Sequence, residues 1–405
     1  MISKNWSRRS AAVCTTSLLA GGLVWAQPTQ PAQPAEPQKP SPTIALVDAS
    51  DAAQWQSLIA GSGWQIVTAP ADPDANIDKR VQALGLKVAE AVKAGTADSS
   101  RIYVAGRADS AAVVFYAIAR MPDRWAAGVA LGGSPKTAIA TNRVFAVNFT
   151  DTPILWASNG ANDSDYAAKL KLDGLNVEWR NSTGLTNQAV MEWMAAHVRA
   201  EYPMTVDCET NSPTFASCYW VQPTKFDAGE RNDVLPMTLI PGEAGSAFDL
   251  GGFGYRANDP GPGVTVAFLP EKYNGPLKVG DVLEALDGKP IENAHHLAQI
   301  LEKADITRNA VVMVRRGKDR IRVETRIVVP HRDPVVTARV KAQYMPEDRQ
   351  ILIISRAITE MRVTIPPEWV PGDLLWNGLT LENVKTAGCY ALKLEKELLH
   401  AGPCQ

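Results

Sequence analysis

Short apolar runs alternate with longer, helix-periodic segments between residues 43 and 200. Apolar runs of about five residues predict strands, and apolar residues that recur every three or four positions predict helices. The expected strands are 43–47, 64–68, 102–105, 128–131, 154–157 and 177–179. The expected helices are 52–60, 77–92, a small-residue segment after 106–110, a segment through 167–170, and 188–200. This alternation predicts a parallel sheet with helices on both faces.

The pattern changes after residue 200. Apolar stretches separated by proline and glycine predict strands at 205–208, 217–221, 335–344, 350–355, 362–365 and 390–394. Between them, residues 245–330 form a separate unit with an expected helix at 294–303 and a hairpin at 310–328. We expect the strands on either side of this unit to form one β-sandwich, into which the unit is inserted.

The first 26 residues have the pattern of a secretory signal. Three cations precede an apolar run at 11–24, and Val24-Trp25-Ala26 offers a small-x-small cleavage site. The run is too short for a permanent membrane span, with an uncleaved anchor as the alternative. Residues 27–42 are proline-rich and predict an extended linker. We therefore expect export by the Sec or twin-arginine route to the bacterial periplasm or the medium, with no integral membrane span after cleavage.

Composition adds limits on fold and function. A chain of 405 residues predicts about two to four domains, and its 45% hydrophobic content can supply their cores. A net charge of −2 gives no support for nucleic-acid binding.

The cysteines fit an exported protein. Cleavage would remove Cys14 and leave four, and an even count favours two disulfides. Three pairings are possible, and the short loops favour Cys208–Cys218 and Cys389–Cys404. The spacing is not that of a metal site, and we expect neither a metal nor a cofactor.

A strand–turn–helix–strand order occupies 101–133, and its turn is Gly106-Arg107-Ala108-Asp109-Ser110. The strand Arg101-Ile-Tyr-Val-Ala-Gly106 and three further motifs resemble the esterase and dienelactone-hydrolase-like branch of the α/β-hydrolases. Those motifs are Arg120-Met-Pro-Asp-Arg-Trp, Thr152-Pro-Ile-Leu-Trp and Glu192-Trp-Met-Ala-Ala-His. The resemblance implies a G-x-S-x-G nucleophile elbow, in which Ala108 stands where the serine should be.

Other catalytic positions of the family are also replaced. The resemblance places Asp163 at the acid, where it is equally expected as a turn or helix-cap residue. It places Leu185 at the histidine and Asp48-Ala49-Ser50 at the oxyanion loop. The implied domain therefore lacks the catalytic serine and histidine, and no catalytic residue is assigned.

Ser110 is the alternative nucleophile, although it falls in the first turn of the expected helix. The sole histidine between 43 and 200 is His197, expected on the terminal helix facing solvent. A serine without a base is a poor nucleophile, and Asp109 as nucleophile would still require a histidine-activated water. An ester hydrolase or peptidase that uses Ser110 and Asp163 remains the alternative function.

The segment Pro276-Leu-Lys-Val-Gly-Asp281 and its continuation to Ile291 resembles a PDZ domain of the bacterial periplasmic type, with Gly275-Pro276-Leu277 as a small departure. Its glycine-rich turn would present backbone N–H groups to a chain-terminal carboxylate, beside a strand edge that pairs with a peptide. The resemblance implies these peptide-binding residues: Leu250, Gly251, Gly252, Phe253 and Gly254. Leu297 and Leu301 either line the side-chain pocket or belong to the core.

Residues 201–240 and 331–405 more weakly resemble the β-module that follows the hydrolase domain in some exported esterase-like proteins, through Ser217-Cys-Tyr-Trp220, Ile351-Leu-Ile-Ile and Leu375-Trp-Asn-Gly378. Carbohydrate binding by Trp220, Trp369 and Trp376 is the alternative to a role in the core.

The predicted architecture is multidomain: a three-layer α/β sheet (43–200), a β-sandwich (201–244 with 331–405) and an inserted α+β PDZ domain (245–330). The expected function is that of an exported, non-catalytic scaffold. It would bind a protein C-terminus or extended peptide through the PDZ domain, with a small ligand in the hydrolase-like cleft and no nucleic-acid partner.

Overall fold

The computed structural model describes residues 39–70, 76–242, 247–255, 260–328, 336–396 and 398–404. The expected signal segment and residues 27–38 of the expected linker lie outside the described residues. No helix in the described ranges is long and apolar enough to cross a membrane.

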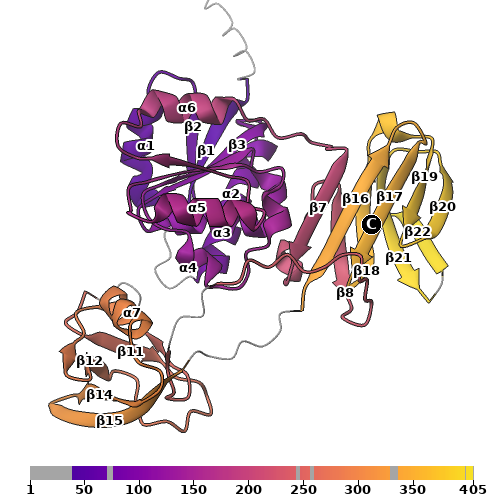
Figure 1. The fold of residues 1–405 in the computed structure, drawn as a ribbon. Helices are drawn as coiled ribbons and strands as arrows, with labels where there is room; N and C mark the ends of the chain where they lie inside the picture. Colours follow the sequence, from indigo (N-terminus) through magenta and orange to yellow (C-terminus); the bar gives the residue numbers. More distant parts are fainter. Residues whose placement is uncertain are drawn as a thin grey trace, which may run out of the picture. The chain divides into compact units, whose positions relative to one another are not determined.

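Residues 41–195, here called the α/β module, contain a six-stranded parallel sheet in the order β2-β1-β3-β4-β5-β6 (Figure 1). The strands are β1 (Ser41–Leu46), β2 (Gln65–Thr68), β3 (Ala97–Arg107), β4 (Ala127–Leu131), β5 (Ile154–Ser158) and β6 (Val177–Asn181). The helices are α1 (Ala52–Ile59), α2 (Ile77–Lys93), α3 (Ser110–Arg120), α4 (Lys136–Ile139), α5 (Asp163–Leu172) and α6 (Asn187–Ala195). The predicted parallel sheet is confirmed.

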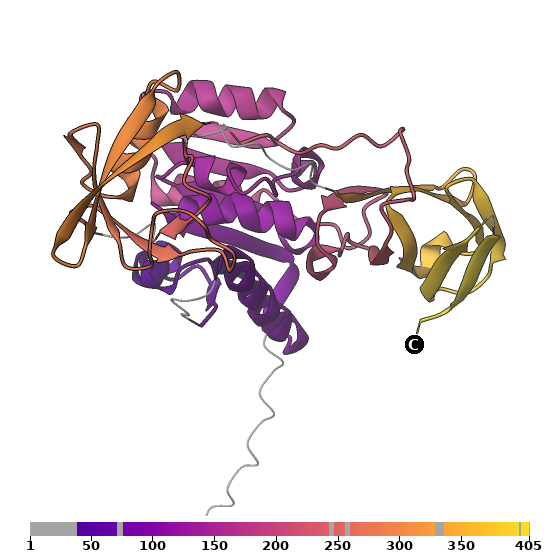
Figure 2. The same cartoon turned by 90° about the horizontal axis from the view of Figure 1, so that it is seen from below.

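Helices lie on both faces of this sheet (Figure 2), and a separate apolar core packs against each face. Helices α2, α3 and α5 supply one core, and α1 and α6 supply the other. The strand order reverses between β1 and β3, because β2 lies on one side of β1 and all later strands lie on the other. Crevices for ligands in open α/β sheets form outside the carboxyl ends of strands at such a reversal.

The last helix is shorter than predicted. It ends at Ala195, and the chain beyond it follows the start of β3, where the Arg199 N–H donates to the Ser100 carbonyl at 2.8 Å. The Tyr103 hydroxyl donates to the His197 carbonyl at 3.0 Å. These bonds replace the helical ones that the sequence pattern had favoured up to residue 200.

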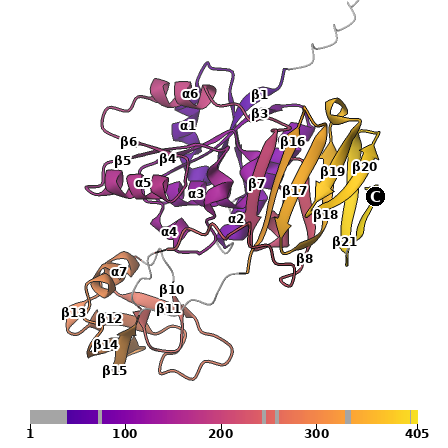
Figure 3. The same ribbon diagram turned by 45° about the vertical axis from the view of Figure 1, so that its right-hand side comes forward.

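Residues 205–226 and 338–403, here called the β-rich module, form two sheets around one core (Figure 3). One sheet has the order β20-β19-β17-β16-β7, and the other has the order β22-β21-β18-β8. The strands are β7 (Thr205–Thr210), β8 (Val221–Phe226), β16 (Ala338–Met345), β17 (Gln350–Arg356), β18 (Ile358–Ile365), β19 (Gly372–Trp376), β20 (Leu379–Val384), β21 (Gly388–Glu395) and β22 (Leu398–Pro403). Strands from both stretches pair with each other, β7 with β16 and β8 with β18.

Two sequence expectations change in this module. The expected strand at 217–221 is a tight turn, closed by reciprocal backbone hydrogen bonds of 2.9 Å between Cys218 and Val221, and β8 begins at Val221. Trp220, Trp369 and Trp376 are 2%, 3% and 0% exposed, so they belong to the core and do not form a carbohydrate-binding surface.

Residues 247–328, here called the β9–β15 unit, have their own core and a sheet in the order β10-β11-β12-β14-β15-β9. Its elements are β9 (Ala247–Phe248), β10 (Gly254–Tyr255), β11 (Val264–Phe268), β12 (Val282–Leu286), β13 (Lys289–Pro290), α7 (Ala294–Glu302), β14 (Asn309–Arg316) and β15 (Asp319–Val328). The predicted helix and hairpin are present as α7 and β14–β15. Strand β10 is at the end of the strand order, with β11 as its neighbour.

Candidate functional site

The corner between β3 and α3 has the strained geometry that the elbow motif predicts. Ala108 is exposed and has a left-handed backbone, with φ of 46°. Such a conformation costs about 1–2 kcal/mol for a residue with a Cβ. A Cβ at Gly106 would lie 2.7 Å from the Ser110 carbonyl oxygen, and one at Gly133 would collide with the Ala108 carbonyl. The corner is therefore built tightly, and it presents a methyl group to solvent.

Ser110 does not replace the missing hydroxyl. It is the first residue of α3 and is 8% exposed. Its hydroxyl faces Asp48, whose pKa is lowered mainly by the Ser50 N–H, against burial, with help from the hydroxyls of Ser50 and Ser110 and from Arg80. A carboxylate with a lowered pKa is a poor general base at neutral pH. Among the described residues, no histidine or lysine hydrogen bonds to Ser110.

His197 lies near the opposite end of β3. The neighbouring Arg199 bonds to Ser100, and Ala108 lies eight positions after Ser100, or about 26 Å along an extended strand. The His197 ring is half-buried rather than fully solvated as expected. It lies 4.4 Å from the Trp193 ring, and its Nδ1 is 2.7 Å from the Trp193 carbonyl. This imidazole is not positioned to activate a nucleophile at the corner.

The remaining triad positions have local structural roles. The Asp163 Oδ2 accepts a hydrogen bond of 2.9 Å from the Gly160 N–H, at the turn that begins α5. Leu185 is half-buried against the core formed by α1 and α6. Neither residue brings an ionisable side chain to the Ala108 corner.

Two carboxylates, Asp48 and Asp51, follow the carboxyl end of β1 beside the end of β3. The Asp51 Oδ2 accepts from the Arg107 N–H at 3.0 Å, and burial raises the pKa of Asp51. The Arg107 guanidinium lies 5.5 Å from the centre of the Trp55 ring. An oxyanion hole needs donors that point at a developing negative charge. Asp48 and Asp51 would repel such a charge instead.

Two hollows are described on the structure, and neither is lined by Ala108, Ser110 or Asp163. One, of about 370 Å³, lies between the end of α1 and α6. The other, of about 470 Å³, lies where α2 and β3 meet the turn before β8. Neither of these two hollows corresponds to the expected ligand cleft above Ala108.

The glycine-rich loop before β10 offers backbone donors. Gly251 and Gly252 have left-handed φ values of 81° and 75° and are exposed. Among the described residues, the N–H groups of Gly251, Gly252 and Phe253 make no hydrogen bond. Leu250 is 4% exposed and anchors the loop in the core. Three successive N–H groups are thus available beside the edge strand, which begins at Gly254.

Helix α7 contributes to the core of this unit. Leu297 and Leu301 are 0% and 7% exposed, and both side chains belong to the apolar core of this unit. The exposed apolar side chains near the loop are Tyr255 of β10 and Phe268 of β11. The Phe253 and Tyr255 rings are 6.2 Å apart.

Disulfides join Cys208 to Cys218 and Cys389 to Cys404, with Cα atoms 5.9 Å and 5.4 Å apart. These are the pairs that the short loops favoured. The first links β7 to the turn before β8, and the second links the ends of β21 and β22.

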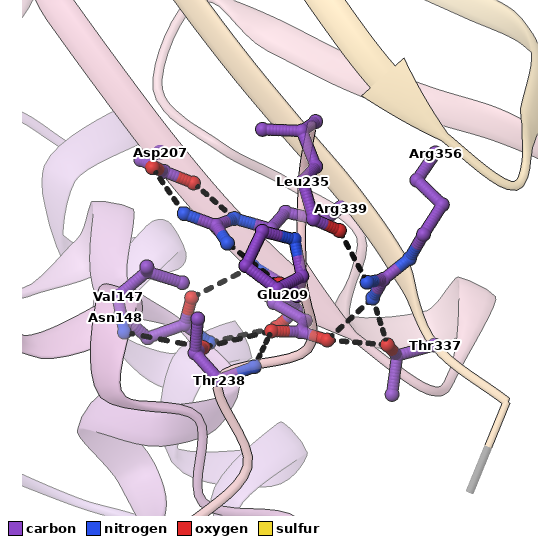
Figure 4. A network of polar contacts seen from close by, with 10 residues as sticks. Val147, Asn148, Asp207, Glu209, Leu235, Thr238, Thr337, Arg339 and Arg356 are labelled. Atoms are coloured by element: carbon purple, nitrogen blue, oxygen red, sulfur yellow. Dashed lines mark hydrogen bonds and ion pairs between the residues drawn. The ribbon is translucent and has the colours of Figure 1, made fainter. Parts of the chain in front are cut away.

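A network of polar contacts joins the α/β module to the β-rich module, and the sequence pattern had not revealed it (Figure 4). The Glu209 side chain of β7 is fully buried. It accepts from the Thr238 N–H at 2.8 Å, the Thr238 hydroxyl at 2.7 Å, the Arg356 guanidinium at 2.7 Å, and the Thr337 hydroxyl. Asn148, from the short helix Ala146–Phe149, bonds to both the N–H and the carbonyl of Glu209. The saturated carboxylate thus ties one sheet of the β-rich module to the loop at Thr238, and the Glu209 backbone ties the same strand to the α/β module.

Comparison with known proteins adds likenesses of fold. No family model matches the chain, and no curated protein matches it. Among solved structures, the esterase Est22 is 12% identical over 39% of this chain and 71% of its own, with a TM-score of 0.30. A thermostable esterase is 15% identical over 40% of this chain and 56% of its own, with a TM-score of 0.30. An HtrA-type protease with a decapeptide is 17% identical over 21% of this chain, with a TM-score of 0.18, and the chain spans 30% of that protease's length.

Proposed function

We propose that this chain is an exported, non-catalytic protein with a hydrolase-like fold, and that its β9–β15 unit is a PDZ domain that binds a protein C-terminus or an extended peptide. The observation that carries the proposal is a row of three N–H groups, at Gly251, Gly252 and Phe253 directly before the edge strand β10, that make no hydrogen bond to any described residue.

The backbone geometry fits this mode of recognition. Successive N–H groups in a left-handed turn form a concave site for an anion such as a terminal carboxylate. The residues before that carboxylate would pair with the free edge of β10 as an added strand. Tyr255 and Phe268, which are 39% and 62% exposed, offer apolar contact to the peptide's side chains.

The corner after β3 supports the absence of catalysis. It exposes the methyl group of Ala108, and the neighbouring Arg107 and Ser110 contact the carboxylates of Asp51 and Asp48. The alternative enzyme would need Ser110 and Asp163 to act together. Ser110 is buried and faces Asp48, whereas Asp163 bonds to Gly160.

The two disulfides support a location outside the reducing cytosol. Together with the expected signal segment, they favour the periplasm or the medium.

Peptide arrays with free C-termini test the binding function, with the chain lacking residues 1–26 as the probe. We expect free-carboxylate peptides to bind at sub-millimolar concentration, and amidation of their ends to weaken binding by at least ~10-fold, because amidation removes the charge that the N–H groups recognise. Absence of any bound peptide would refute the PDZ assignment.

A matched glycine pair sharpens this test. Gly252→Ala places a side chain on a left-handed residue of the loop, and Gly317→Ala does the same in the β14–β15 turn; a Cβ meets open space at both. We expect Gly252→Ala alone to weaken peptide binding.

Labelling with a serine-directed fluorophosphonate tests the alternative enzyme. We expect the chain to stay unlabelled, and stoichiometric labelling at Ser110 would favour the enzyme.

A further inference from the structure

The larger hollow has the volume and lining of a ligand site. Its volume of about 470 Å³ is within the range of small-molecule pockets, which is about 300–1,000 Å³. Apolar side chains of α2 and β3 form one wall, among them Val88, Val92 and Ile102. The opposite wall is aromatic and consists of Tyr202, Tyr219 and Trp220.

A buried carboxylate with an unpartnered oxygen borders this hollow. Asp123 is 8% exposed, and its Oδ2 accepts from the Ser217 hydroxyl, which also lines the hollow. Its Oδ1 is buried and has no hydrogen-bond partner among the described residues. Leaving a buried polar atom unpaired costs about 1–3 kcal/mol, and more for a charged group. A donor from a bound molecule would remove this penalty.

The aromatic wall is preorganised. Tyr219 has a left-handed backbone, with φ of 55°, within the turn that the Cys218–Val221 hydrogen bonds close. The Cys208–Cys218 disulfide ties this turn to β7. The Trp220 indole N–H donates to the Pro203 carbonyl at 2.9 Å. Burial raises the pKa of Tyr219 to about 12, so its phenol is neutral near physiological pH. A fixed wall lowers the entropy lost on binding.

Charges of both signs line the site, with Asp123 and the exposed Glu201 as the acidic residues and Lys93, Arg124 and Arg199 as the basic ones. Lys93 and Arg124 line the hollow and are exposed, and their side chains make no ion pair or hydrogen bond among the described residues. Arg199 also lines it, but its Nε donates to the Ser99 carbonyl at 3.2 Å. A simple cation would be repelled by these groups, and a simple anion would be repelled by Asp123. The arrangement favours a molecule that carries both charges.

We infer that this hollow binds a small zwitterion of the amino-acid type. Its ammonium group donates to Asp123, its carboxylate meets Arg124 and Lys93, and its apolar side chain lies against the aromatic wall. This site is separate from the peptide-binding loop, and its existence does not depend on the PDZ assignment.

Isothermal titration calorimetry tests the inference on the chain lacking residues 1–26, with its disulfides intact. The titrated compounds differ in which of the two charges they carry. The probes are L-phenylalanine, N-acetyl-L-phenylalanine and L-phenylalaninamide. We expect L-phenylalanine to bind and each derivative to bind at least ~10-fold more weakly, because each lacks one charge. No binding of L-phenylalanine up to about 10 mM, the range of the weakest specific sites, would overturn the inference. Equal binding of all three probes would also overturn it, since that indicates apolar contact alone.

Variants locate the site. Asp123→Asn keeps the shape and the Ser217 contact, so we expect an unchanged fold and at least ~10-fold weaker binding of L-phenylalanine. Asp165→Asn, on an exposed position of α5, is the control and should have no effect. Arg124→Gln changes an exposed side chain and should weaken binding by about 3-fold or more even if Asp123→Asn does not fold. Full affinity in a folded Asp123→Asn or in Arg124→Gln would contradict the inference, whereas peptide binding should persist in both.

Discussion

Glu209 and Asp123 are both buried carboxylates near the contact between the α/β module and the β-rich module. They differ in how many hydrogen bonds their oxygens accept. Glu209 is 1% exposed and accepts hydrogen bonds from Thr238, Thr337 and Arg356. Asp123 is 8% exposed, and Ser217 is its hydrogen-bond donor among the described residues. The difference separates a carboxylate whose acceptor capacity is filled within the fold from one that keeps an unpartnered oxygen among the described residues.

The physical reason is the cost of burying charge. A buried carboxylate is tolerated when it is paired and its remaining lone pairs are satisfied. The saturated Glu209 has no capacity left for another donor, so its role is structural. The unsaturated Asp123 retains that capacity, and it is among the residues that line the larger hollow.

The largest effect that the comparison predicts is the loss of stability in Glu209→Gln. The substitution leaves the Arg356 guanidinium without its buried counter-charge, which should lower the free energy of unfolding by about 3–5 kcal/mol. Urea unfolding measures this change. Glu382→Gln, at an exposed position of β20, is the control and should be near neutral. Equal stability of the two variants would erase the distinction between Glu209 and an ordinary surface carboxylate.

A smaller loss of stability is expected when the Cys208–Cys218 disulfide near Asp123 is removed. Replacing both Cys208 and Cys218 with alanine opens a short loop and should lower the free energy of unfolding by about 2–4 kcal/mol. Because the disulfide holds the turn that carries Tyr219, binding of L-phenylalanine should weaken as well. The double variant of Cys389 and Cys404 is the matched control, and it should leave that binding intact.

Asp281, a third buried carboxylate, extends the comparison to the β9–β15 unit. Burial alone would raise the pKa of Asp281, but hydrogen bonds from Arg316 and from the Lys278 N–H outweigh it and hold the pKa below its ordinary value. A lowered folded-state pKa stabilises the unit above the unfolded-state pKa of about 3.9, and this stability is lost as pH falls through the folded-state pKa.

Hydrogen exchange at the amides of β12 and β14 measures this acid sensitivity. We expect protection to fall in acid, and Arg316→Met to lower the protection at neutral pH and to flatten its fall in acid, because the depressed pKa of Asp281 is then lost. Arg322→Met, on an exposed position of β15, should leave the profile unchanged. A pH profile that Arg316→Met does not alter would show that the ion pair does not set the stability of this unit.

The smallest effects are expected at the exposed corner. Ala108→Ser restores an oxygen but supplies neither a base nor an oxyanion donor, so turnover of a chromogenic ester should stay at background. Ala108→Gly relieves the left-handed strain and should raise stability by at most about 1 kcal/mol. Ester turnover by Ala108→Ser that requires Asp163 would show that the triad is closer to completion than the contacts indicate.

The sequence predicted the α/β module well, because its signals are local. Each buried parallel strand is a short apolar run, and the glycines around Ala108 specify the tight corner. The prediction that the last helix continues to residue 200 was wrong, because the backbone hydrogen bond from the Arg199 N–H to the Ser100 carbonyl competes with helical hydrogen bonds.

Three strands of the β-rich module were missed for a different reason. Strands β19, β20 and β22 are short and half-exposed, so their apolar pattern is weak. One signal was present: Asn377-Gly378, with φ values of 47° and 86°, is the two-residue hairpin turn that joins β19 to β20. The contact between Glu209 and Arg356 had no such signal, since it joins residues 147 positions apart.

The pairing of β7 with β16 and of β8 with β18 has a consequence for proteolysis. Each disulfide closes within one side of the intervening segment, so no covalent bond crosses it. A single cut between β8 and β16 would therefore give two polypeptides that stay associated through their strand ladders. They would co-elute as one particle in native buffer and separate only in denaturant, without any reducing agent.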